Sequence, residues 1–123
     1  MSLEVIDRLR VPEAVSKSLH ERQASPPQPV DSRQFPRRYL VASAIVHYGA
    51  GLPAHPRQPQ RHHVVVADLS RRGLRFLHSE QLFPGELATI QIAAGKEMHV
   101  EVARCRKLAD LCYEVGAKFS AGV

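Results

Sequence analysis

The stretch from Asp68 to Gly73 (DLSRRG) gathers residues able to bind a ligand, directly after the apolar run Val64–Val66. Asp68 and Ser70 are common turn residues because their side chains hydrogen-bond to nearby backbone, and Gly73 permits a positive φ. A turn is therefore the simplest interpretation. The same three residues could also hold a flat polar ring, because a carboxylate accepts N–H donors, a hydroxyl donates or accepts, and a glycine lets a ring approach the backbone.

Arginines supply a second group of candidate ligand residues, in the segment SRQFPRRY at 32–39. Arg33 and Arg37 are four residues apart, which on a helix would place both on one solvated face. Pro36 argues against a helix, since it lacks an N–H and disfavours helical geometry at the residue before it. We therefore expect an extended arm, with a solvated basic linker as the alternative. Guanidinium groups match phosphate oxygens and the N7/O6 edge of guanine.

The two groups have complementary chemistry. The carboxylate of Asp68 can accept the N1–H and N2–H donors of guanine's Watson–Crick edge. The arginines can bind phosphate or the opposite edge of the same base. Taken alone, each group is better explained as a solvated basic linker or a turn, but together their chemistry would match a guanine base and a phosphate.

Catalytic and metal sites are not indicated. The seven histidines and the two cysteines follow no metal-ligand spacing, and no glycine-rich phosphate loop is present. His62 and His63 are adjacent, so on a strand their rings point to opposite faces. We predict no enzyme activity, no metal and no cofactor.

The elements that must position these residues are strands. Alternating or continuous apolar segments bounded by turn residues recur from Tyr39 onward. This pattern predicts an all-β fold, specifically a six-stranded antiparallel β-barrel or a sandwich. The predicted strands cover 39–48, 63–69, 74–78, 86–93, 97–107 and 111–119. The Gly/Pro-rich segment 49–62 is expected to be a long mobile loop.

The N-terminal part differs in composition from the rest. Residues 2–22 have thin helical periodicity and could form a docking helix, but a frayed tail is the favoured interpretation because the apolar stripe is narrow. The segment SPPQP at 25–29 is expected to be a linker. We therefore divide the chain into an extension at 1–31, flexible or partly helical, and a barrel domain at 32–123.

The last two predicted strands suggest a definite register. Centring the hairpin between Leu108 and Ala109 puts Val100 opposite Ala117 and Val102 opposite Val115, and makes one face apolar. That register places Cys105 directly opposite Cys112 on the outer face. We predict that the two thiols are close but reduced, as expected in a cytoplasmic protein.

Composition sets limits on the class of protein. The chain has 123 residues and a net charge of +5, which suits one domain and an anionic partner. No apolar stretch is long enough to span a membrane, and the N-terminus does not have the pattern of a signal peptide. We expect a cytoplasmic protein without membrane insertion.

Two motifs, taken together, resemble the PilZ domain family of bacterial cyclic di-GMP receptors. Residues 33–37 have the form RxxxR, and residues 68–73 have the form (D/N)xSxxG, each placed as in that family: the first before the first strand, the second after the second strand. The ending YEVGAKF (113–119) is similar to the family's last barrel strand. The resemblance covers about 33–120. It implies ligand contacts from Arg33, Arg37, Asp68, Ser70 and Gly73, with Arg38 added by adjacency.

The resemblance implies a non-enzymatic receptor for cyclic di-GMP. The arm at 32–38 would close over the ligand, move residues 1–30 relative to the barrel, and so signal to a downstream protein partner. Two alternatives remain open. One is a basic barrel that binds nucleic acid, which we expect less because the chain has no Trp and few aromatic side chains for base stacking. The other is a PilZ-like protein-interaction module without ligand.

Overall fold

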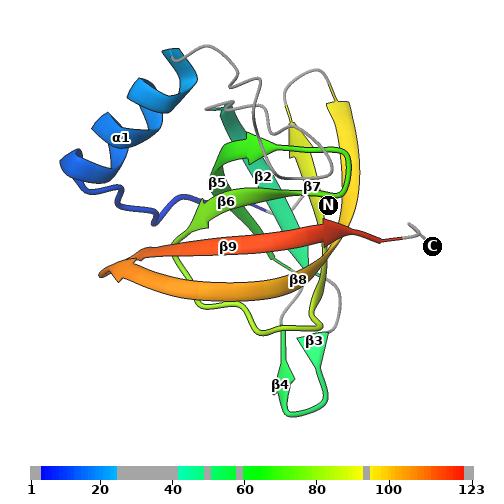
Figure 1. Ribbon diagram of the computed structural model, residues 1–123. Helices are drawn as coiled ribbons and strands as arrows, with labels where there is room; N and C mark the ends of the chain where they lie inside the picture. Colours follow the sequence, from blue (N-terminus) through cyan, green and yellow to red (C-terminus); the bar gives the residue numbers. More distant parts are fainter. Residues whose placement is uncertain (1–3, 25–41, 49–50, 58–59, 93–94, 121–123) are drawn as a thin grey trace.

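The computed structural model describes residues 4–24, 42–48, 51–57, 60–92 and 95–120. In these ranges it contains one helix and nine strands, several of them very short (Figure 1). In chain order the elements are β1 (Val5–Ile6), α1 (Glu13–Ala24), β2 (Ala42–Tyr48), β3 (Gly51–Leu52), β4 (His55–Pro56), β5 (Arg61–Leu69), β6 (Gly73–His78), β7 (Leu87–Ile92), β8 (Lys96–Ala109) and β9 (Cys112–Phe119).

Six of the strands form a closed antiparallel barrel. Their order is β5-β2-β7-β8-β9-β6, and the pairing of β6 with β5 completes the circle. The predicted six-stranded barrel is confirmed, and each of the six predicted strands corresponds to one of these. The short β1 adds to β5 in parallel, with Val5 opposite Arg61.

The barrel interior is filled by the inward residues of each strand, as a period of two requires. Val64, Val66, Phe76, Val100 and Val115 are all fully buried there. The apolar face predicted for the last hairpin is likewise buried at Val100, Val102, Val115 and Ala117.

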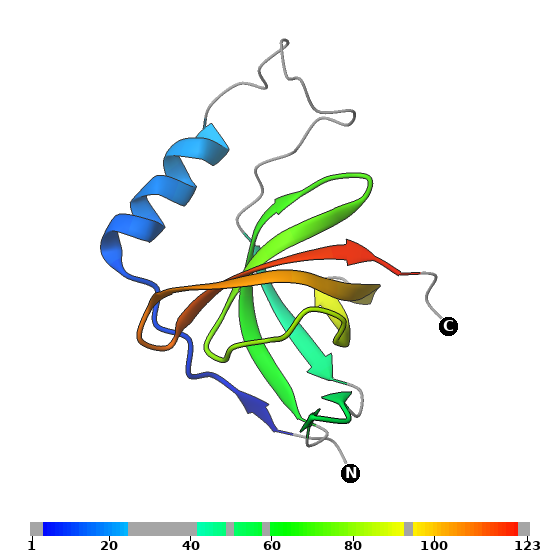
Figure 2. The ribbon, with the colours of Figure 1, turned by 60° about the horizontal axis from the view of Figure 1, so that its bottom comes forward.

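The N-terminal extension packs against the outside of the barrel. Leu19 of α1 is buried in a second apolar cluster with Ala67, Leu77 and Cys112. The backbone N–H of Arg10 also donates to the Leu111 carbonyl (N···O 3.0 Å). Figures 1 and 2 show α1 beside the barrel wall. The favoured interpretation of a frayed tail is wrong for residues 4–24, because outward apolar side chains of β5, β6 and β9 need a cover.

The predicted register of the last hairpin is wrong, by two residues at Val100 and by three at Cys105. Val100 lies opposite Phe119, and Cys105 lies opposite Val115, so the two cysteines are not paired. The turn is made by Asp110 and Leu111, and Leu111 takes φ = 56°, a conformation that the sequence does not signal because glycine or asparagine usually occupies it. A shift of two residues keeps the apolar face of this hairpin inward.

A bulge in β8 changes the face of the residues that follow it. The register shifts between Val102 and Arg104, so Arg104 points outward opposite Gly116, whereas Cys105 packs against the core. The sequence pattern had placed Arg104 on the apolar face and Cys105 on the outer one. Both placements are therefore wrong, and the correction brings a cation to the outer surface.

Candidate ligand-binding site

The motif residues after the second predicted strand come together at one hairpin. Asp68 is near the end of β5, Ser70 lies in the turn, and Gly73 begins β6. The other three predicted ligand residues, Arg33, Arg37 and Arg38, lie outside the described residues.

Ser70 stabilises the turn itself. Its backbone N–H donates to the Gly73 carbonyl (N···O 2.9 Å), and its hydroxyl donates to the same oxygen (3.3 Å). The hydroxyl oxygen is still able to accept a hydrogen bond. The turn and the ligand interpretations of this residue are therefore compatible.

Gly73 is required by a close approach of two strands. A β-carbon at this position would lie 2.0 Å from the Ala117 carbonyl oxygen and 2.8 Å from the Lys118 Cα. Its φ lies outside the left-handed region, so the positive φ offered as a reason for this glycine is not the cause. The N–H of Phe119 donates to the Arg72 carbonyl beside it (N···O 2.7 Å). The β6–β9 contact thus needs glycine at 73, because β9 backbone fills the space that a side chain would take.

Asp68 is held by an arginine of the next strand. Its Oδ2 lies 2.9 Å from Nε of Arg75, and both side chains are largely buried. Arg75 also contacts Glu114 (Nη1 to Oε2, 3.1 Å), which in turn contacts Arg106 (Oε1 to Nη2, 3.2 Å). Arg75, which Glu114 also holds, therefore fixes the Asp68 carboxylate beside the turn, whereas Arg106 is exposed at the solvent end of this row of charges.

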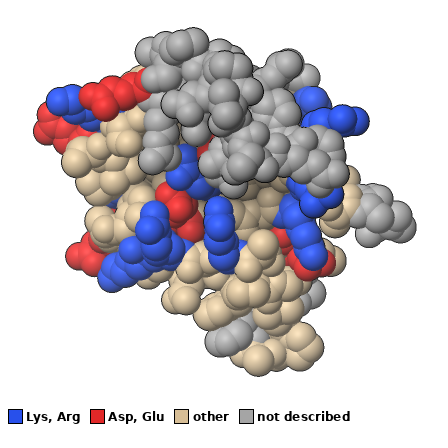
Figure 3. Space-filling model, viewed as in Figure 1, with Lys and Arg blue, Asp and Glu red and all other residues tan. Residues whose placement is uncertain are grey.

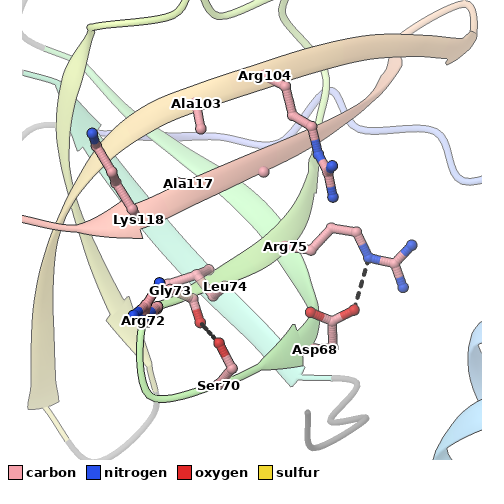
Figure 4. Close-up of a pocket in the computed structure, with 11 residues that line it drawn as sticks. Asp68, Ser70, Arg72, Gly73, Leu74, Arg75, Ala103, Arg104, Ala117 and Lys118 are labelled. Carbon is pink, nitrogen blue, oxygen red and sulfur yellow. Dashed lines mark hydrogen bonds and ion pairs between the residues drawn. The ribbon is translucent and has the colours of Figure 1, made fainter. Parts of the chain in front are cut away.

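These residues surround a hollow of about 280 Å³ on the outer face of β6, β8 and β9. Figure 4 shows Asp68, Arg75 and Arg104 on one side of it and Arg72 and Lys118 on the other. Its floor is formed in part by Gly73 and Gly116. The hollow therefore lies between cationic groups, which suits an anionic ligand.

Arg104, Arg75 and Lys118 were missed by the sequence reasoning. Arg104 projects across β9, where the missing side chain of Gly116 makes room: a β-carbon there would lie 2.8 Å from the Arg104 Nε. The useful signal was the glycine in YEVGAKF, since a glycine inside a strand often marks a close approach.

The face around the hollow carries both charges. Figure 3 shows Lys and Arg side chains spread over β8 and β9, with Asp and Glu between them. Several are paired: Lys118 with Glu101 (3.4 Å) and Lys107 with Asp110 (3.2 Å). The positive field is therefore broken by carboxylates.

A second polar cluster lies at the other end of β5. The ring nitrogen Nε2 of His78 hydrogen-bonds to the Tyr48 hydroxyl, and the Glu80 N–H donates to His78 Nδ1 (3.0 Å). The inward ring of His62 packs against both rings, with centroids 5.2 Å from Tyr48 and 5.1 Å from His78. The prediction that His62 and His63 face opposite sides is confirmed, because His62 is buried in the barrel and His63 contacts Asp7 outside.

Burial governs the protonation of this cluster. Desolvation, together with the neighbouring His62 and Arg57, lowers the pKa of His78 to about 3. Burial also lowers the pKa of His62 and raises that of Tyr48. Neutral His78 then donates from Nε2 and accepts at Nδ1, so both of its nitrogens are satisfied.

Arg57 closes this end of the barrel from the segment predicted to be a mobile loop. Its Nε and Nη2 donate to the two Glu86 oxygens (2.7 and 2.9 Å), and Nη2 also donates to the Gln81 carbonyl (2.7 Å). The guanidinium lies over the Tyr48 ring, 5.1 Å from its centroid. The described part of the segment forms the β3–β4 hairpin, so the prediction of one long loop is wrong for residues 51–57.

The described residues show neither a metal site nor a helix that could span a membrane. They contain no group of three or more His, Cys, Asp or Glu side chains placed to hold a metal ion. Their one helix is neither long nor apolar enough to cross a membrane.

Comparison with known proteins gives one match. The family model of the PilZ domain matches residues 31–122, which is most of the chain. None of the curated proteins matches it.

Proposed function

The chain belongs to the PilZ domain family, and on that premise we propose that it is a receptor for cyclic di-GMP. PilZ domains are ligand-binding receptor or adaptor domains rather than enzymes. The observation that carries the proposal is the hollow at the β5–β6 turn, where Asp68, Ser70 and Gly73 meet. A guanine at this place would donate N1–H and N2–H to the Asp68 carboxylate beside the turn formed by Ser70 and Gly73.

Arg75 has a defined part in this proposal. It already contacts Asp68 and Glu114, so it keeps the Asp68 carboxylate in one orientation. A preoriented acceptor loses less conformational freedom when the ligand binds. The matching arginines of the RxxxR motif, Arg33 and Arg37, with Arg38, would bind the phosphates and the other edge of the base.

The output of binding would be a change at the N-terminal side. Closing the arm at 32–38 over the ligand would pull on the chain that leads back to α1. We propose that a downstream protein reads the resulting position of residues 1–30. A ligand can shift this segment toward one conformation only if it makes contacts in that conformation that the other one lacks. The contacts of the arginines with the ligand would be of this kind.

Isothermal titration calorimetry with cyclic di-GMP at physiological salt tests the proposal. The chain has no Trp, so heat is a better signal than intrinsic fluorescence. Saturable binding should weaken about tenfold to a hundredfold in each of Arg37→Ala, Arg33→Ala and Asp68→Ala, since charge-assisted hydrogen bonds contribute about 1.5–3 kcal/mol. GTP should give no comparable heat.

A matched control uses Arg106→Ala, which removes a 70% exposed arginine of β8 that contacts Glu114. Its affinity should equal that of the wild type. Folded wild-type protein that gives no heat with cyclic di-GMP would contradict the proposal and favour an interaction module without ligand.

Nucleic acid binding is the second candidate, because of the net charge of +5 and the basic side chains over β8 and β9 (Figure 3). The carboxylates of Glu101, Glu114 and Asp110 on the same face count against it, since they would repel phosphates. Affinity for single-stranded oligonucleotides that falls steeply with salt, without preference for cyclic di-GMP, would favour this candidate.

A further inference from the structure

Outward residues of four strands form one row across the barrel. The register puts Arg104 of β8 opposite Gly116 of β9, Gly116 opposite Arg75 of β6, and Arg75 opposite Asp68 of β5. The row therefore begins at the carboxylate assigned to guanine and ends at a cation. Between the two ends lies a glycine without a side chain.

Gly116 determines where Arg104 lies. A β-carbon on Gly116 would be 2.8 Å from Nε and 3.0 Å from Cγ of Arg104, closer than atoms in contact tolerate. The Arg104 side chain thus occupies the space that any other residue at 116 would fill. Figure 4 shows it directed from β8 across β9 toward the side of Arg75.

Arg104 also differs from its cationic neighbours in its contacts. Arg75 contacts Asp68 and Glu114, and Lys118 contacts Glu101. In the described part of the chain, Arg104 has no carboxylate within ion-pair distance and no hydrogen-bond partner. A guanidinium that is positioned by packing, faces a hollow and lacks a protein anion is suited to an anion from outside.

We propose that Arg104 binds a phosphate of the cyclic dinucleotide while the nucleotide lies in the hollow between Asp68 and Arg104. The inference rests on the proposed function, and it adds a contact from β8 that neither sequence motif contains. A guanine held at Asp68 at one end of the row directs its ribose and phosphate along the row toward Arg104. Arginine then supplies a planar pair of donors for the phosphate oxygens.

The test compares Arg104→Gln with wild type by calorimetry with cyclic di-GMP. Affinity should fall about tenfold to a hundredfold. The difference between the two proteins should shrink as salt is raised from 50 to 500 mM, because a phosphate contact is screened. A purely structural role would leave that salt dependence unchanged.

Arg106→Gln is the matched control. It removes the same charge from the same strand two residues further on, at a side chain that is 70% exposed and that contacts Glu114. Its affinity should stay within about twofold of wild type, and both variants should keep the wild-type melting temperature.

Gly116→Ala tests the position of the Arg104 side chain without removing its charge. It keeps every charge but fills the space used by the Arg104 side chain, so it should weaken binding by a factor similar to that of Arg104→Gln. Wild-type affinity in either variant would overturn the inference while leaving the proposed function standing. Wild-type protein that fails to bind cyclic di-GMP would instead overturn the proposed function, and the inference with it.

Discussion

Arg57 and Arg104 show two different uses of an arginine in one barrel. Arg57 lies at the closed end, where Glu86 and the Gln81 carbonyl take its donors and the Tyr48 ring lies beneath it. Arg104 lies at the open hollow, positioned over Gly116 without a carboxylate among the described residues. An arginine whose donors are used by the protein stabilises the fold, whereas one without an anion is available to a ligand.

The largest expected effect comes from breaking the closed cluster. Arg57→Met should lower the free energy of unfolding by about 3–5 kcal/mol, because it leaves the buried Glu86 carboxylate without its cation. Urea denaturation measures it. Removing both charges in Arg57→Met with Glu86→Gln should recover part of the loss. A loss below about 1 kcal/mol for Arg57→Met alone would show that Arg57 does not stabilise the fold as the comparison with Arg104 requires.

The two glycines of the hollow should respond differently to the same substitution. Gly73→Ala should cost about 2–4 kcal/mol, because its β-carbon would meet the backbone oxygen of Ala117 at 2.0 Å. Gly116→Ala meets only the flexible Arg104 side chain and should cost less than about 1 kcal/mol. Thermal or urea unfolding of the two variants measures these losses. Equal losses would show that the backbone contact at Gly73 is no more restrictive than the side-chain contact at Gly116.

The buried His78 should make stability depend on pH. Its pKa is about 3 in the folded protein and near 6.5 in the unfolded chain, so below pH 6.5 the unfolded state binds a proton that the folded state does not. Stability should therefore fall as pH decreases from about 6.5 toward 3, by roughly 1.4 kcal/mol per pH unit for this group. The lowered pKa of His62 acts in the same direction.

Urea midpoints at pH 7, 6 and 5 measure this dependence, with His78→Gln as the comparison. At pH 7 the variant should be less stable than the wild type. The slope of its free energy of unfolding against pH should be smaller by roughly 1.4 kcal/mol per pH unit, the contribution of one proton. An unchanged slope would assign the dependence to other groups.

The smallest expected effect is at the rim. Arg106→Gln should change the free energy of unfolding by less than about 0.5 kcal/mol, because its ion pair with Glu114 is exposed to solvent. Urea denaturation again gives the value. A loss comparable to that of Arg57→Met would remove the distinction between the two ends of the barrel.

The sequence predicted the six strands because apolar residues with a period of two leave few other ways to bury a core. It also brought Asp68, Ser70 and Gly73 together, since they are neighbours in the chain. It missed Arg104, because a bulge of one residue in β8 reverses which residues face outward. Arg57 was missed for a different reason: its partners Glu86 and Gln81 are distant in sequence and no local pattern joins them.

The docking of α1 fixes the start of the segment that carries the RxxxR motif. Residues 25–41 connect the end of α1 at Ala24 to the start of β2 at Ala42, and α1 is fastened to the barrel through Leu19. Arg33, Arg37 and Arg38 are consequently tethered from two sides, and their effective concentration at the hollow depends on chain length rather than on protein concentration. If the proposed function holds, deleting residues 1–24 should free one tether and lower the affinity for cyclic di-GMP, although every proposed ligand residue remains in the chain.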